Sequence, residues 1–232
     1  MERIILIETS TALCSVALAE DGVIVDYRES SAPKAHASLT AVFIQEMLAE
    51  RGLSVTDCDA VCVSMGPGSY TGLRVGVSTA KGLCFGARKP LIAVGTLDTL
   101  VAQASDAPDY KYIVPMIDAR RMEVYTAVFE IAGQAGNDVR QTTETAPMII
   151  DENSFAEILA EGPVLFIGDG AGKCADVIKH PNAHFCQCHP KASSMLSPAL
   201  EAYKEKRFED VAYFEPFYLK EFVATVSKKK LF

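Results

Sequence analysis

The sequence predicts an α/β protein built from two similar units, and three observations lead to this fold class. Apolar runs of strand length alternate along the chain with longer segments of helical periodicity. Glycine-rich stretches stand between a predicted strand and a predicted helix in both halves, at 66–72 and 168–172. The 232 residues, 49% of them hydrophobic, suffice for two small domains with sizeable cores.

The first unit, residues 1–105, begins with a three-stranded meander at 3–8, 13–19 and 23–29. Glu20-Asp21-Gly22 supplies the tight turn between its last two strands. Alternating helices and strands then follow at 34–50, 59–65, 71–86, 90–94 and 96–105. This order predicts one mixed sheet with flanking helices.

The second unit, residues 106–232, begins with a polar linker at 106–110. Its predicted strands are 111–117, 122–130, 137–150 and 163–167. Its predicted helices are 152–160, 170–179 and 193–207. This half is also read as α/β, so the chain could contain two similar units of about 110 residues.

Two helices of the first unit share an unusual apolar pattern. In the helix at 34–50 the apolar arc is about twice the ~100° of an ordinary surface helix, more than one sheet can cover. In the helix at 71–86, small residues follow one side and larger apolar residues another, although glycine there costs roughly 1 kcal/mol relative to alanine. We expect a partner-docking surface, since exposed apolar patches tend to mark interfaces; the alternative is that the glycines only relieve crowding inside the unit. The expected docking residues are Leu39, Ala41, Phe43, Ile44, Met47, Leu48, Leu73, Gly76, Val77, Ala80 and Cys84.

Three loops could hold the phosphates of a nucleotide, because each leaves a predicted strand. The first follows 3–8, where Glu8 could orient a hydrated magnesium ion, although these few residues by themselves favour a plain hairpin turn. The second precedes the helix at 71–86, with Thr71 as the expected N-cap, and its glycines could serve a sharp turn instead. The third is not a Walker A loop, since Cys174 stands where Ser or Thr should bind magnesium. The candidate residues are Glu8, Thr9, Ser10, Gly68, Ser69, Gly168, Gly170 and Gly172.

Charge and cysteine content narrow the classes of partner. The net charge of −8 makes the chain alone a poor binder of nucleic acid. Its seven scattered cysteines are read as reduced thiols of a cytosolic protein. Cys186 and Cys188, with His184 and His189, offer only a weak zinc pattern, and ordinary thiols are the better interpretation. We expect neither a membrane span nor a signal peptide, and a cytoplasmic protein.

Four stretches together resemble one known family. The signature GPGSYTGLRVG at 66–76, the opening IETSTALCSVAL, the element DARRMEVY at 118–125 and the closing PFYLKE at 216–221 are similar to those of the TsaB (YeaZ) family. Lys220 stands in the closing motif for the usual arginine. The resemblance runs from end to end, being strongest over 1–105 and loosest over 130–200.

The resemblance implies two actin-like (Hsp70-like) lobes and a role in threonylcarbamoyladenosine synthesis on tRNA. It implies a paralogous catalytic partner, TsaD, whose equivalent helices would pair with the docking surface, and an ATPase subunit, TsaE, reached through the complex. Contact with tRNA would be indirect. TsaD carries a His-x-x-x-His metal pair after the corresponding strand, whereas this chain has Thr96 and Leu100 there. Because neither side chain replaces imidazole, we expect no metal site, no catalytic residue and no required cofactor.

Other functions stay open at the level of sequence. An ATP-dependent phosphotransferase could use Asp118 and Glu8, and older labels of these relatives suggest a peptidase. A third class is a homodimeric scaffold that uses the same helices. Either ATP or ADP could occupy the loops, or they could be kept for their shape alone. His36, which has Thr40 and no second histidine at i+4, is expected to be a hydrogen-bonded or solvated residue near a helix start.

Overall fold

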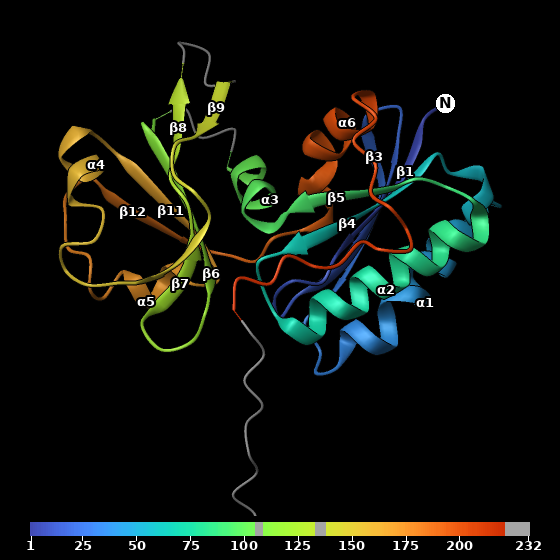
Figure 1. The fold of residues 1–232 in the computed structure, drawn as a ribbon, viewed down its shortest axis with the longest axis horizontal. Coiled ribbons are helices and arrows are strands. Elements are labelled where there is room, and N and C mark those ends of the chain that lie inside the picture. Colours follow the sequence, from blue (N-terminus) through green and yellow to red (C-terminus); the bar gives the residue numbers. More distant parts are fainter. Residues whose placement is uncertain (105–108, 133–137, 221–232) are drawn as a thin grey trace, which may run out of the picture.

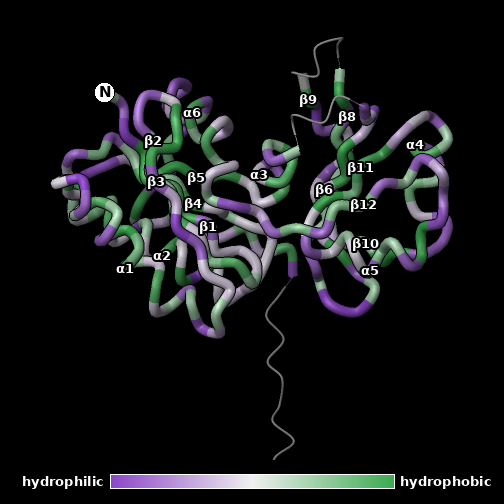
Figure 2. The backbone as a smooth tube through the Cα atoms, turned by 180° about the vertical axis from the view of Figure 1, so that it is seen from behind, coloured by the Kyte–Doolittle hydropathy of each residue, from purple (hydrophilic) through white to green (hydrophobic). Residues whose placement is uncertain are grey.

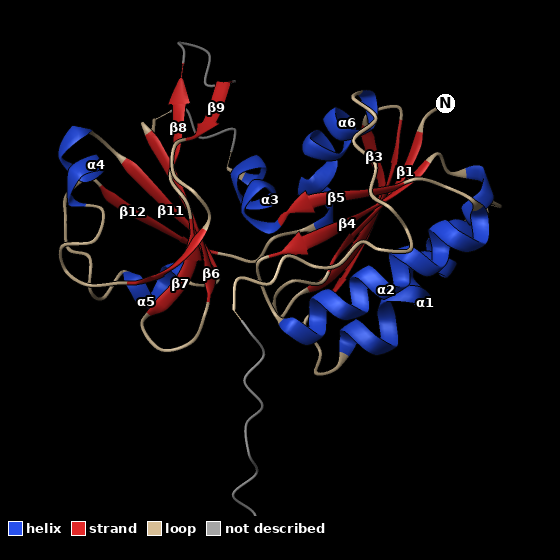
Figure 3. Ribbon diagram, in the orientation of Figure 1, coloured by secondary structure: helices blue, strands red, loops and turns tan. Residues whose placement is uncertain are grey.

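Two mixed β-sheets form the two lobes of the protein, and a computed structural model describes them over residues 1–104, 109–132 and 138–220. Figure 1 shows the sheets side by side, with helices around each and helix α3 between them. Figure 3 shows the same layers by type of element, and each lobe is a sheet flanked by helices, as predicted. Most of the linker at 106–110 and Glu221 of the closing motif lie outside the described residues.

The first sheet has the strand order β3-β2-β1-β4-β5. Its meander strands pair antiparallel, and β4 and β5 continue parallel to β1. The strands are β1 Arg3–Glu8, β2 Cys14–Glu20, β3 Val23–Ser30, β4 Ala60–Gly66 and β5 Leu91–Gly95. The central strands are almost entirely buried on both faces, so both faces need a covering layer.

The second sheet repeats this arrangement with the order β10-β7-β6-β11-β12. Again two antiparallel pairings lead to a strand from which two parallel strands continue. Strand β8 lies beside β6, and β9 lies beside β8. The bounds are β6 Tyr112–Asp118, β7 Glu123–Thr126, β8 Phe129–Ala132, β9 Asp138–Gln141, β10 Ala146–Ile149, β11 Val164–Gly168 and β12 Ala183–Gln187. The two lobes are therefore similar units, as the element order suggested.

Several predicted elements of the second lobe are wrong in extent. The strand expected at 122–130 is two strands, because β7 and β8 pair with different parts of β6 along its length. The strand expected at 137–150 is β9 and β10, and the helix expected at 170–179 is only α5, Ala171–Cys174. Edge strand β12, Ala183–Gln187, was not predicted. Only its pairing with β11 reveals it.

The lobes exchange helices across the 105/106 boundary. Helix α3, Thr96–Gln103, packs Leu97 and Leu100 into a core with Ile113 and Ile117 of the second sheet. Conversely the 3-10 helix η2, Ala192–Met195, and α6, Leu196–Lys204, cover a face of the first sheet, in a core with Ile4. Residues near 192–204 thus belong structurally to the first lobe, because its sheet has a second apolar face that no helix from 1–105 covers.

The remaining helices cover the other face of each sheet. Helices α1, Ala35–Ala49, and α2, Tyr70–Ala87, lie together on the first sheet, and α4, Ala156–Glu161, shares a core of the second lobe with α5. Figure 2 shows hydrophobic colouring concentrated in the inner strands and hydrophilic colouring in many of the connecting loops. The short 3-10 helix η1, Val55–Asp57, precedes β4.

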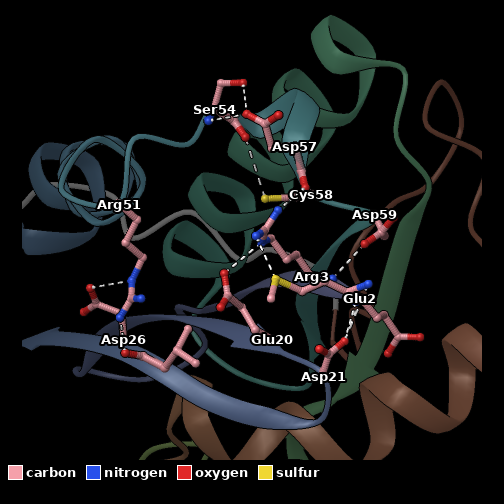
Figure 4. A network of polar contacts seen from close by, with 12 residues as sticks. Glu2, Arg3, Glu20, Asp21, Asp26, Arg51, Ser54, Asp57, Cys58 and Asp59 are labelled. Carbon is pink, nitrogen blue, oxygen red and sulfur yellow. Dashed lines mark hydrogen bonds and ion pairs between the residues drawn. The ribbon is translucent and has the colours of Figure 1, made fainter.

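A polar network fixes the edge of the first sheet where the chain enters β4. The backbone N–H of Arg3 donates to Asp59 Oδ2 at 2.7 Å, and its guanidinium Nε lies 2.7 Å from Glu20 Oε1. Figure 4 shows Arg3 between these acids, with the capped turn Ser54–Asp57 nearby. The network joins β1, β2 and the start of β4, and so holds together the strands from which the first loop and the β4–α2 loop extend.

Candidate functional site

A cleft of about 650 Å³ lies where the two lobes meet. Its walls come from the β1–β2 loop, the β4–α2 loop, the β6–β7 hairpin and the C-terminal segment Phe217 to Lys220, together with His36 of α1 and Asp169 of the third loop. The three loops that could hold phosphates therefore gather at one place, as expected of two lobes that face each other. Ligand pockets in proteins typically have 300–1,000 Å³, so the cleft has a suitable size.

The first loop turns its acid away from the cleft. Glu8 is fully buried, and its Oε1 accepts the backbone N–H of Ser10 at 2.6 Å and the hydroxyl of Ser64 at 2.9 Å. Burial raises the pKa of this carboxyl, although the hydrogen bonds to Ser10 and Ser64 oppose the shift. Glu8 therefore does not face the cleft as the proposed magnesium ligand would.

The second loop packs directly on the first. The backbone N–H of Ser69 donates to the carbonyl of Ser10 at 2.6 Å. A Cβ added to Gly68 would lie 2.3 Å from that carbonyl, and one on Gly72 would lie 2.1 Å from the carbonyl of Thr9. Ser69, not Thr71, is the N-cap of α2, accepting from the backbone of Gly72 at 3.3 Å. These glycines serve the close approach of two chain segments.

The third loop holds the β6–β7 hairpin. Asp169 Oδ1 accepts the backbone N–H of Asp118 at 2.9 Å, and burial raises the pKa of Asp169. Lys173 binds the Asp118 carboxylate and donates to the carbonyls of Arg121 and Glu123 at 2.8 and 2.7 Å. A Cβ on Gly168, whose φ is +134°, would lie 2.2 Å from the Met116 carbonyl.

Side chains and carbonyls of the chain itself thus occupy amide groups that a phosphate would need. Gly172 donates to Gln187 Oε1 at 2.6 Å, and Gly170 donates to the carbonyl of Met116 at 3.0 Å. The loops do not fit a polyphosphate in this arrangement. Among the buried side-chain atoms that have no partner in the described residues, four are oxygens of the first loop: Glu8 Oε2 and the hydroxyls of Thr9, Ser10 and Thr11. Of these residues, Ser10 and Thr11 line the cleft.

The two positions at which the resemblance led us to look for a histidine pair are part of the core. Thr96 and Leu100 on α3 are both fully buried, and Leu100 packs against the second sheet. His36 has the predicted hydrogen-bonded role, with its Nε2 lying 2.8 Å from the carbonyl of Thr11. Within the described ranges, no three His, Cys, Asp or Glu side chains gather closely enough to hold a metal ion.

The predicted docking surface on α1 and α2 needs correction. Ile44, Met47, Leu48, Leu73, Gly76, Val77, Ala80 and Cys84 are buried, almost all of them in the core of their own lobe, so they cannot form an open surface. Leu39 and Phe43 are half-buried, and only Ala41 of the predicted set is exposed. The apolar arc is wide because the two helices pack on each other as well as on the sheet.

A different set of residues faces outward on these helices. We define the outer helix face by Ala41 and Val42 of α1 and by Ser78, Gly82, Phe85 and Gly86 of α2, all of which are exposed. Phe85 is 82% exposed, and no described heavy atom lies within 4 Å of a Cβ on Gly82 or Gly86. Beside this face, a groove of about 500 Å³ runs between Ala37 and Arg74. Sequence reasoning missed Phe85, although it follows Cys84 directly on the glycine side of α2.

The cysteines match the reduced state that was expected. All seven are free, and five of them are buried. Cys186 is exposed and Cys188 is half-buried, and burial raises the pKa of Cys188 to about 12. No helix within the described ranges has both the length and the apolar character needed to cross a membrane.

Comparison with known proteins identifies relatives of this chain. A family model described as "TsaD: tRNA N6-adenosine threonylcarbamoyltransferase" matches residues 29–228. The tRNA threonylcarbamoyladenosine biosynthesis protein TsaB of Escherichia coli K12 is 32% identical over 226 residues, 96% of each chain. TsaB of Bacillus subtilis 168 is 33% identical over 168 residues, 71% of this chain and 70% of that protein.

This chain is also similar to a transferase and to a solved structure. The tRNA N6-adenosine threonylcarbamoyltransferase of Maricaulis maris is 35% identical over 98 residues, which are 41% of this chain and 26% of that enzyme. The structure of YeaZ from Pseudomonas aeruginosa has a TM-score of 0.81 at 25% identity, covering 94% of this chain and all of that one. By fold, motifs and full-length similarity, the chain belongs to the TsaB (YeaZ) family of tRNA threonylcarbamoyladenosine biosynthesis proteins, which shares a family model with the transferase TsaD.

Proposed function

We propose that this chain is a non-catalytic subunit of a tRNA threonylcarbamoyl transferase and that it acts by docking on the paralogous catalytic subunit, TsaD. The ATPase TsaE would join through the complex. The observation that carries the proposal is the outer helix face, where an almost fully exposed Phe85 stands beside two glycines with open space above them. Glycine inside a helix lowers the stability of the helix. Because no neighbour crowds these two positions, close packing within the chain does not explain why they are glycines.

A second helix pair would fit this face. Gly82 and Gly86 let another helix backbone come close, and Phe85 supplies the apolar anchor that hot spots of interfaces usually contain. This chain matches the family model described for TsaD over 29–228, a range that includes both helices, which supports the expectation of an equivalent helix pair in the paralogue. A pseudo-symmetric four-helix contact is the arrangement that we propose.

The state of the nominated acids supports a non-catalytic role. Glu8 is buried under the second loop, and Asp118 is bound by Lys173 and by the backbone N–H of Arg120 at 2.8 Å. Thr96 and Leu100 are core residues where the transferase has its histidines. Neither the phosphotransferase nor the peptidase alternative receives a specific supporting observation, and we propose that no nucleotide is required on this chain.

Co-purification with TsaD tests the docking. Ala41→Glu and Phe85→Glu each place a charge on the outer helix face, and each should reduce the recovered complex at least tenfold. Val23→Glu, which changes a 62% exposed side chain on β3, is the matched control and should bind like the parent chain. Mass measurement without TsaD tells whether the same face forms a homodimer instead. Folded Ala41→Glu and Phe85→Glu variants that retain TsaD would refute the proposed interface.

Reconstitution tests the function itself. TsaD and TsaE should modify tRNA efficiently only when this chain is added, and Phe85→Glu should fail to support the reaction. Threonylcarbamoyl transfer by this chain without TsaD would contradict its non-catalytic role.

A further inference from the structure

The β6–β7 hairpin holds two arginines in an unusual backbone conformation at the edge of the cleft. Arg120 and Arg121 have φ values of 71° and 50°, in the left-handed region that glycine and asparagine normally occupy in such turns. Both side chains are exposed, and Arg120 lines the cleft. Within the described residues neither guanidinium has an ion-pair or hydrogen-bond partner.

The rest of the turn is tightly bound, so these two side chains are presented by a fixed support. Lys173 contacts the turn at three places, namely the Asp118 carboxylate and the carbonyls of Arg121 and Glu123. Asp169 accepts from the Asp118 backbone. Lys220 from the C-terminal segment binds Glu123.

Two acids around the turn are already paired with lysines, which leaves the guanidiniums of Arg120 and Arg121 as its unpaired cations in the described part of the chain. Asp118 is paired with Lys173, and Glu123 with Lys220. Asp169 is mostly buried and committed to the hairpin backbone, with His189 at 4.0 Å. Glu215 is close enough to Tyr218 to raise the pKa of that tyrosine, after burial and the effect of Tyr70.

Aromatic rings line the same cleft. Tyr218 is 38% exposed and Phe217 is 41% exposed, and both contribute to the wall that faces Arg120. The ring of Tyr70 lies 4.9 Å from that of Tyr218, and the guanidinium of Arg74 lies 5.4 Å from the centre of Tyr70. Tyr70 lines both the cleft and the groove beside the outer helix face, so the two depressions are neighbours.

Two buried hydroxyl groups belong to residues that line the cleft. Ser10 and Thr11 line the cleft, are 1% and 4% exposed, and have hydroxyl oxygens without a partner among the described residues. Unpaired guanidiniums, rings open to stacking and unsatisfied hydroxyls match the phosphate, the base and the ribose 2′-hydroxyl of single-stranded RNA. An acidic peptide would use the guanidiniums but would not need the rings.

We propose that the interlobe cleft of this chain binds a single-stranded segment of RNA, with Arg120 and Arg121 on its phosphates and Tyr218 as a stacking surface. This extends the proposed function, on which it rests for the presence of RNA, by giving this chain a direct share of the RNA contact in place of the indirect contact expected from the net charge. Free nucleotides are a poorer match, because the loop amides that would hold a polyphosphate are already bound.

The test measures the anisotropy of a fluorescently labelled RNA hairpin with a single-stranded loop, using the full chain without TsaD, so failure of the docking proposal does not affect the result. Arg120→Gly with Arg121→Gly removes both cations and retains residues suited to the left-handed turn. This double variant should weaken binding about tenfold. It should also lower the steepness of the plot of log K against log salt concentration by roughly 0.7 for each lost phosphate contact. Arg88→Gly, at another exposed arginine with φ 55°, is the matched control and should change affinity less than about twofold.

Tyr218 provides an independent readout. Tyr218→Ala should weaken RNA binding, and Tyr218→Phe should restore it, because stacking requires the ring and not the hydroxyl. Absence of RNA binding by the parent chain at low salt, or unchanged binding by the double variant, would overturn the proposal. So would a glutamate-rich peptide that binds more tightly than RNA and depends on the same arginines, since the turn would then recognise an acidic protein segment.

Discussion

Two glycines of helix α2 should respond to the same substitution with opposite signs. A Cβ on Gly76 would lie 2.2 Å from Thr9 Oγ1 and 3.4 Å from a methyl group of Val63, whereas a Cβ on Gly82 meets no described atom within 4 Å. Thr9 is fully buried under the helix and cannot simply turn away, so Gly76→Ala must push α2 outward. Overpacking of this kind costs about 1–3 kcal/mol.

The helix propensity of alanine offsets part of that cost. Alanine is favoured over glycine in a helix interior by about 1 kcal/mol, so we expect Gly76→Ala to lower the free energy of unfolding by a net of about 1–2 kcal/mol. Gly82→Ala gains the propensity without a clash and should raise the free energy of unfolding by about 0.5–1 kcal/mol. For a chain of this size each kcal/mol corresponds to about 2–4 °C in Tm.

Urea and thermal unfolding of both variants, followed by circular dichroism, measure the difference. The parent chain and Gly86→Ala, another position with open space, are the controls. Equal changes of the same sign in Gly76→Ala and Gly82→Ala would refute the reasoning, because they would show that contact with the first loop does not determine the residue at position 76.

Three further predictions follow from the buried groups and the loops. Burial raises the pKa of Glu8 above its ordinary 4.5, so the folded state holds this proton more tightly; the resulting stability is present below pH 4.5 and lost as the pH rises towards the folded pKa. As the pH rises from 4.5 towards the folded pKa of Glu8, the free energy of unfolding of Glu8→Gln should therefore increase relative to that of the parent chain. A difference between the two that does not change with pH in unfolding titrations would contradict this. Maleimide at pH 8 should label the exposed Cys186 fast and Cys188 slowly, because the pKa of Cys188 is about 12. Cys186→Ser should then remove the fast phase of labelling seen by mass spectrometry. Calorimetry with micromolar ATP should give no heat, and heat that Gly170→Asp abolishes would show that the loop amides do open to a phosphate.

The local pattern was enough to predict the framework of the first lobe. Its strands are short apolar runs bounded by turns such as Asp21-Gly22, and both features are local, so β1, β2 and β4 lie within one or two residues of the predicted ranges. The exact role of the glycines was not accessible in this way. Gly68 and Gly72 are required by the carbonyls of Ser10 and Thr9, which are more than fifty positions away in the chain.

The second lobe was harder because its elements depend on pairing. Strand β12 is recognisable only beside β11, and the break between β7 and β8 follows from the length of β6. The same holds for the site: Phe217 and Tyr218 reach the cleft only because the C-terminal segment returns to the first lobe, where Phe217 donates to the carbonyl of Met65 at 2.8 Å.

By itself, then, the sequence determined the α/β class, the family motifs and the presence of apolar helices beside the glycine turn, because each of these depends on residue type and short spacing. Only the tertiary structure decided which apolar residues remain exposed, which loop amides are already bound and which lobe each helix covers. The physical reason is that burial and hydrogen bonding are satisfied between segments distant in sequence, so a periodic pattern shows that a face must be covered without showing what covers it.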